Sequence, residues 1–157
     1  MSGGNTSKIY KHSSRSEKET EEFGRNFAST LKDGDIVLLK GELGAGKTTM
    51  VKGILHGLRG ETFFGVKSPS YTVLNIYPGV PQVHHFDFYR IENPEDLEEL
   101  GLNDYWGKGI CLVEWPKSFC SSLPGRKIEA DISIGEGDFR EITILREDEI
   151  SHESLKR

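Results

Sequence analysis

The sequence predicts an α/β domain in three layers, with a mixed sheet that is parallel at its centre and flanked by antiparallel hairpins. Two observations indicate this class. An apolar run at residues 36–39 leads into a glycine-rich loop, and apolar residues at helical spacing follow that loop. Two pairs of strand-like segments, 73–77 with 82–89 and 127–134 with 139–145, are each joined by a short turn-forming connection.

The glycine-rich loop reads Gly-Glu-Leu-Gly-Ala-Gly-Lys-Thr at residues 41–48 and fits the phosphate-binding pattern G-x-x-x-x-G-K-[ST]. Its glycines allow successive N–H groups to converge on an anion at the positive end of the following helix. Lys47 would reach the β- and γ-phosphates, and the Thr48 hydroxyl would bind Mg²⁺. The strand before the loop and the helix after it supply the context that the pattern requires. We therefore expect a P-loop NTPase-like domain that binds a nucleotide with Mg²⁺.

The chain has 157 residues, of which 35% are hydrophobic, so it is long enough for one core and short for two. We expect a single domain at residues 13–146, a disordered N-terminal tail at 1–12 and a polar C-terminal tail at 147–157.

The composition also bounds the class of protein. The net charge of −5 argues against a surface built mainly to hold nucleic acid. No run reaches membrane-spanning length and no leader precedes the domain, so the expected location is the cytoplasm, with no membrane partner. No Cys/His spacing suggests zinc, and Cys111 is interpreted as a core residue.

The first helix is predicted to begin at a capping box formed by Ser16 and Glu19 and to end at Asp33-Gly34, just before the strand at 36–39. The helix after the phosphate loop is expected to run to about Gly60.

Pro69 predicts an exposed, hydroxyl-rich loop at residues 66–72. A short helix is predicted to start at residues 93–96 and to close at Gly101, before a second apolar strand at 110–113.

Two carboxylates follow apolar runs at the sheet edge where α/β proteins bind ligands. Asp87 lies between two phenylalanines, where an unpaired charge would be costly, and a metal or its waters would satisfy it. The alternative is an aspartate turned to solvent. Glu114 ends the strand at 110–113 and would hold Mg²⁺ through water or orient the attacking water. Its alternative role is to cap a nearby backbone group.

Several hydroxyl side chains and one arginine also have both a functional and a structural interpretation. Ser68, Ser70 and Thr72 could contact the γ-phosphate or Mg²⁺ as a switch-like loop does, or serve as ordinary turn hydroxyls. Arg90 could neutralise transition-state charge or pair with the acidic helix that follows it.

Three aromatic or imidazole side chains have simpler interpretations. His84 and His85 are interpreted as packing or hydrogen-bonding residues. Trp115 could stack on a base or be a half-buried core residue.

Four segments together resemble the bacterial TsaE (YjeE) ATPase family, in unchanged order between about Ser16 and Leu123. They are Gly-Glu-Leu-Gly-Ala-Gly-Lys-Thr-Thr at 41–49, Ser-Pro-Ser-Tyr-Thr at 68–72, His-Phe-Asp-Phe-Tyr-Arg at 85–90 and Val-Glu-Trp-Pro at 113–116. Ser70 stands where threonine is more usual and keeps the hydroxyl. No motif beyond Leu123 matches.

This resemblance implies an ATPase that works with the TsaB and TsaD proteins to make threonylcarbamoyl-adenosine in tRNA, which it meets only through that complex. It also implies a Walker-B-like role for Asp87 and a metal-site role for Glu114.

The expected function is therefore an Mg²⁺-dependent ATPase that drives or resets a TsaB–TsaD complex. A small-molecule kinase is the second interpretation, although no arginine-rich lid is evident. A nucleotide-sensing module that does not hydrolyse is the third. Adenine is preferred because the resemblance implies it and because no Asn-Lys-x-Asp run, which would favour guanine, is present.

The expected catalytic residues are Lys47, Asp87 and Glu114, and the expected metal ligands are Thr48, Asp87 and Glu114. The expected nucleotide contacts are Glu42, Leu43, Gly44, Ala45, Gly46, Lys47, Thr48, Thr49, Ser70 and Thr72.

Overall fold

The computed structural model describes residues 8–60 and 65–146. In chain order its elements are β1 (Lys8–Ser14), α1 (Glu17–Ala28), β2 (Ile36–Lys40), α2 (Lys47–Arg59), β3 (Leu74–Tyr77), β4 (Val83–Asp87), α3 (Pro94–Glu99), the 3₁₀ turn η1 (Leu102–Tyr105), β5 (Ile110–Glu114), the 3₁₀ turn η2 (Ser118–Ser122), β6 (Lys127–Ile134) and β7 (Arg140–Arg146). Among these described elements, no helix has the length and apolar character needed to cross a membrane.

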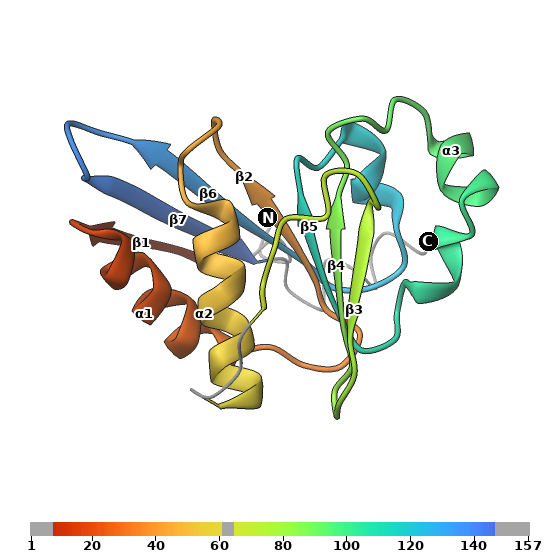
Figure 1. The fold of residues 1–157 in the computed structure, drawn as a ribbon, viewed down its shortest axis with the longest axis horizontal. Helices are drawn as coiled ribbons and strands as arrows, with labels where there is room; N and C mark the ends of the chain where they lie inside the picture. Colours follow the sequence, from red (N-terminus) through yellow and green to blue (C-terminus); the bar gives the residue numbers. More distant parts are fainter. Residues whose placement is uncertain (1–7, 61–64, 147–157) are drawn as a thin grey trace, which may run out of the picture.

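All seven strands form one sheet in the order β1-β7-β6-β2-β5-β4-β3 (Figure 1). The strands β6, β2, β5 and β4 are parallel neighbours. The pairs β1–β7, β6–β7 and β3–β4 are antiparallel. The predicted mixed sheet, parallel at the centre with hairpins at both sides, is therefore confirmed. The carboxyl ends of the four parallel strands meet at one edge, which is where the site lies.

Helices cover both faces of the sheet. On one face α1 and α2 pack side by side over β7, β6, β2 and β5 (Figure 1). On the other face α3, η1 and η2 cover the apolar side chains of β2, β4 and β5. The helices α1 and α2 approach so closely that a Cβ on Gly53 would lie 2.1 Å from the Glu21 carbonyl oxygen. Because α2 carries the phosphate loop at its start, this contact fixes the loop against the first helix.

Two predicted boundaries were wrong. Residues 8–12, assigned to the N-terminal tail, belong to β1, which pairs with β7 from Lys8↔Arg146 to Ser14↔Arg140. The composition of β1 is polar because it is an edge strand, and this hid it from a search for apolar runs. Residues 1–7 and 147–157 of the predicted tails lie outside the described residues.

The first helix ends at Ala28, not at Asp33-Gly34, although its predicted start at the Ser16 cap is confirmed by the hydrogen bond from the Glu19 N–H to Ser16 Oγ (3.1 Å). After Ala28, the hydroxyls of Ser29 and Thr30 donate to the carbonyls of the last helical turn. Such local side-chain bonds compete with continuation of the helix.

Candidate functional site

The phosphate loop connects β2 to α2 as its pattern predicts. Residues 36–39 of β2 are fully buried, which anchors the start of the loop in the core. Gly46 is the N-cap of α2 and has φ of 112°, a left-handed conformation that glycine adopts without a steric cost. A Cβ on Gly41 would lie 2.7 Å from the Ile132 carbonyl oxygen, so the loop also packs directly on β6. The loop is thereby held at the positive end of a thirteen-residue helix.

Lys47 points back over the loop. Its ammonium donates to the carbonyls of Gly41 (2.6 Å) and Glu42 (3.0 Å) and lies 3.8 Å from the centre of the Trp115 ring. Burial lowers the pKa of Lys47, while the negative charges of Glu114 and Asp87 act in the opposite direction. A phosphate chain in the loop would provide this ammonium with a charged acceptor in place of the two carbonyls.

Asp87 and Glu114 lie side by side because they are register partners at the ends of the parallel strands β4 and β5. Both side chains are buried, with 5% and 3% of their surface exposed, so the alternative of an aspartate turned to solvent is excluded. Asp87 accepts hydrogen bonds from the Ser68 hydroxyl (3.0 Å) and the Tyr89 N–H (2.9 Å).

Glu114 links the end of β5 to the start of α2. The Thr48 hydroxyl lies 3.1 Å from each of its carboxylate oxygens, and His85 Nε2 lies 2.6 Å from Oε2. His85 is fully buried on β4. The sequence interpretation of His85 as a hydrogen-bonding residue is correct, but its partner could not be predicted. The imidazole and the hydroxyl together orient the carboxylate of Glu114.

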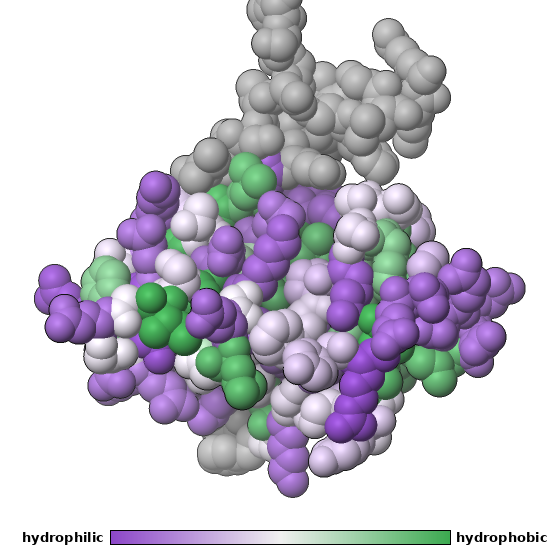
Figure 2. All heavy atoms as spheres, turned by 90° about the horizontal axis from the view of Figure 1, so that it is seen from above, coloured by the Kyte–Doolittle hydropathy of each residue, from purple (hydrophilic) through white to green (hydrophobic). Residues whose placement is uncertain are grey.

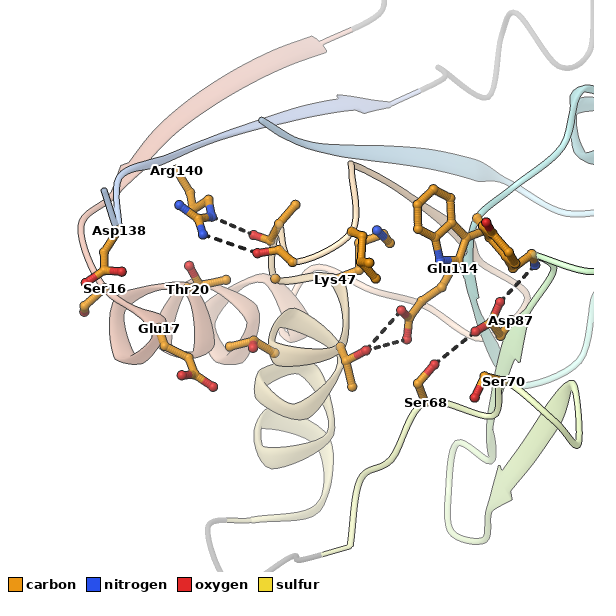
Figure 3. A pocket seen from close by; sticks show the side chains of 18 of the residues that line it. Ser16, Glu17, Thr20, Lys47, Ser68, Ser70, Asp87, Glu114, Asp138 and Arg140 are labelled. Atoms are coloured by element: carbon orange, nitrogen blue, oxygen red, sulfur yellow. Dashed lines mark hydrogen bonds between the residues drawn. The ribbon is translucent and has the colours of Figure 1, made fainter. Parts of the chain in front are cut away.

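These groups line one pocket of about 790 Å³. Figure 3 shows the side chains around it. Most of the predicted site residues line it: Leu43, Gly44, Ala45, Gly46, Lys47, Thr48, Thr49, Ser70, Asp87 and Glu114. Two predicted residues, Glu42 and Thr72, are not among the lining residues. Glu42 contributes its carbonyl to Lys47, and the Thr72 hydroxyl lies 3.5 Å from Asn75 Oδ1 on an exposed surface.

The opposite end of the pocket was missed by the sequence interpretation. Figure 3 shows it at the side away from Asp87 and Glu114. Its lining residues come from the start of α1 and from the β6–β7 hairpin: Ser16, Glu17, Thr20, Asp138 and Arg140. Local sequence signals identify Ser16 as a helix cap but mark none of these residues as part of a site, because only the strand order brings the first helix and the last hairpin beside the phosphate loop.

Arg90 also lines the pocket, and its guanidinium lies 4.7 Å from the centre of the Tyr71 ring. Of the two alternatives, the pocket-facing position is compatible with a role toward bound phosphates, and the contact with Tyr71 keeps the cation at the pocket wall.

The donor set fits Mg²⁺ that is shared with a bound phosphate chain. Within residues 8–60 and 65–146 there is no cluster of three or more His, Cys, Asp or Glu side chains suited to a metal ion. Mg²⁺ commonly needs only one or two carboxylates, because substrate phosphates and waters complete its octahedron. The Thr48 hydroxyl can donate its proton to Glu114 and still offer a lone pair to a metal. Thr48, Asp87 and Glu114 are therefore the residues that could hold the ion.

The sheet is parallel at its centre, and a glycine-rich loop joins a buried strand to a helix. Acidic groups stand at the ends of the neighbouring strands. Together these features define a P-loop NTPase-like domain. Comparison with known proteins narrows this class. The family described as "Threonylcarbamoyl adenosine biosynthesis protein TsaE" matches residues 14–142, and the chain belongs to this TsaE family.

Individual relatives agree with this assignment. The chain is 41% identical over 128 residues to the tRNA threonylcarbamoyladenosine biosynthesis protein TsaE of Bacillus subtilis, covering 80% of this chain and 78% of that one. It is 37% identical over 138 residues to the TsaE protein of Rickettsia typhi, covering 87% and 94%. The crystal structure of Bacillus subtilis YdiB superposes with a TM-score of 0.72 at 31% identity, covering 96% of this chain and 97% of that one.

Proposed function

We propose that this chain is an Mg²⁺-dependent ATPase that serves as an accessory subunit in the biosynthesis of threonylcarbamoyladenosine in tRNA. The observation that carries the proposal is the convergence of Lys47, Thr48, Asp87 and Glu114 on one pocket of about 790 Å³. A volume of this size is in the range of small-molecule and cofactor sites. Membership of the TsaE family supports the role in threonylcarbamoyladenosine biosynthesis, and the pocket supports the binding and hydrolysis of ATP.

Phosphoryl transfer requires a protein mainly to position the reactants and to stabilise charge, and different residues of the pocket have these roles. The loop N–H groups and Lys47 bind the phosphate chain. Bound Mg²⁺ would neutralise charge on the β- and γ-phosphates. Thr48 and His85 orient Glu114, which would hold the metal shell or align the attacking water.

The loop around Ser68 is suited to sense the γ-phosphate. The Ser68 hydroxyl donates to Asp87, and Ser70 lines the pocket from the same loop, which has no helix or strand of its own between residues 65 and 73. Segments of this kind become ordered when a triphosphate supplies extra contacts.

We predict that amide hydrogen exchange across residues 68–72 slows more with a non-hydrolysable ATP analogue than with ADP, because only the triphosphate carries the γ-phosphate. Exchange measured by mass spectrometry on the two complexes at saturation checks this. Residues 95–99 of α3, which do not line the pocket, serve as an internal reference. Equal protection of residues 68–72 by both nucleotides would contradict the switch and indicate a static turn.

A partner protein is proposed because the pocket has an exposed apolar rim. Leu43 and Tyr89, which line the pocket, are 86% and 64% exposed, and Tyr71, which contacts the lining residue Arg90, is 82% exposed. Figure 2, which views the molecule from above relative to Figure 1, shows small groups of hydrophobic residues among hydrophilic ones on the side that it draws. Apolar side chains at the mouth of a nucleotide pocket can be covered by a partner that responds to the nucleotide state. The proposed partner is a TsaB–TsaD-like complex, which brings the tRNA, and the proposed location is the cytoplasm.

Reconstitution tests the proposal. We expect slow ATP hydrolysis by the isolated chain, ATP-dependent binding to a TsaB–TsaD complex and faster hydrolysis in that complex. Repeated cycles of tRNA modification should require this chain and should stop with Lys47→Ala. The proposal fails if modification continues through many cycles without the chain, or if its binding to the partners is the same with ATP, with ADP and without nucleotide.

A further inference from the structure

Arg140, at the start of β7, connects the last hairpin of the chain to the phosphate loop. Its Nε donates to the Ala45 carbonyl (3.1 Å) and its Nη2 to the Gly44 carbonyl (3.2 Å). Its Nη1 donates to two carbonyls of its own hairpin, those of Gly137 (3.0 Å) and Phe139 (2.9 Å). Within the described part of the chain the guanidinium thus makes four hydrogen bonds, all of them to backbone carbonyls, and two of these carbonyls belong to the loop.

These contacts bear on the direction of the loop N–H groups. The carbonyl of Ala45 and the N–H of Gly46 belong to one planar trans peptide and point in opposite directions. Holding this carbonyl on Arg140 therefore turns the Gly46 N–H away from Arg140. The neighbouring peptide is held at both ends, because the Gly44 carbonyl accepts from Arg140 while the Ala45 N–H donates to the Glu42 carbonyl (3.0 Å). The conformation of the loop at residues 44–46 is thus set from outside the loop.

We propose that Arg140 is a positioning residue for nucleotide binding, which orients the phosphate loop by clamping the carbonyls of Gly44 and Ala45. The inference rests on the proposed function, since it concerns the same pocket. The planar fork of arginine suits this role, because it can span two successive carbonyls while a second edge binds the hairpin. A lysine at this position would keep the positive charge but would lack the planar, forked set of N–H donors.

Two measurements test the clamp. The first is the affinity for Mg²⁺-ADP and for a non-hydrolysable Mg²⁺-ATP analogue, determined by calorimetry for the wild-type chain, Arg140→Ala and Arg140→Lys. We expect Arg140→Ala to weaken both nucleotides by about tenfold and to a similar extent, because loop N–H groups bind phosphates that ADP and ATP share. Arg140→Lys should recover only part of this loss. The second is hydrogen exchange of the amides of residues 44–46 without nucleotide, which should be faster in Arg140→Ala.

Arg146→Ala is the matched control, because it removes an arginine from the other end of the same strand, about 20 Å away. Arg146 donates to Thr30 Oγ1 and packs on the rings of Tyr10 and Phe27, without contact to the loop. It should leave nucleotide affinity and exchange at residues 44–46 unchanged. Wild-type affinity and exchange in a folded Arg140→Ala would overturn the clamp, and full recovery by Arg140→Lys would show that charge alone is sufficient. Absence of nucleotide binding by the wild-type chain would instead overturn the proposed function.

Discussion

Replacement of Lys47 by alanine is expected to weaken binding of Mg²⁺-ATP by about 10- to 100-fold while leaving the fold intact. Hydrogen bonds that involve a charged group contribute about 1.5–3 kcal/mol each, which corresponds to this loss for one ammonium–phosphate contact. Among the described residues, the Lys47 ammonium without a ligand contacts only the carbonyls of Gly41 and Glu42 and the face of Trp115. None of these contacts holds the sheet to its helices, so the variant should fold.

Calorimetric titration with ATP and Mg²⁺ measures the effect, and a thermal unfolding curve of each protein checks the fold. Lys52→Ala is the matched control, because Lys52 is an exposed lysine on the same helix and does not line the pocket. The control should bind ATP as the wild-type chain does. Unchanged affinity in a folded Lys47→Ala protein would refute the assignment of the loop as the phosphate site.

The parts of the site that could be predicted from sequence are those that local patterns encode. The buried run at 36–39, the loop glycines and the helix after Lys47 lie within 25 consecutive residues from 36 to 60, and each has a fixed relation to the next. Asp87 and Glu114 were found because each follows a buried strand, and parallel strands bring their carboxyl ends to one edge.

The parts that could not be predicted depend on strand order and register. Arg140 reaches the phosphate loop because the sheet has the strand order β7-β6-β2. No pattern within residues 127–146 indicates that order. His85 meets Glu114 only because β4 and β5 are neighbours in a register that pairs Asp87 with Glu114. Such contacts join residues far apart in the chain, and a single sequence carries no record of them.

Replacement of Glu114 by glutamine is expected to lower ATP turnover by about tenfold or more while ATP binding weakens much less. The amide keeps the shape of the side chain and can still form hydrogen bonds with Thr48 and with His85, which now surround the carboxylate at 3.1 and 2.6 Å. The charge is the property that is lost. If that charge acts on the metal shell or the attacking water, the loss falls on the chemical step rather than on recognition of the phosphates.

Single-turnover hydrolysis and calorimetry on the same protein separate these two effects. Glu129→Gln is the control, because Glu129 is a carboxylate on β6 that pairs with Lys40 at 2.7 Å, away from the pocket. It should retain wild-type turnover. Wild-type turnover in Glu114→Gln would return Glu114 to a purely structural role, in which it only anchors Thr48 and His85. A loss of ATP affinity as large as the loss of kcat/KM would mean that Glu114 holds the metal in the ground state and has no separate part in hydrolysis, because an interaction made only in the transition state leaves ground-state binding unchanged.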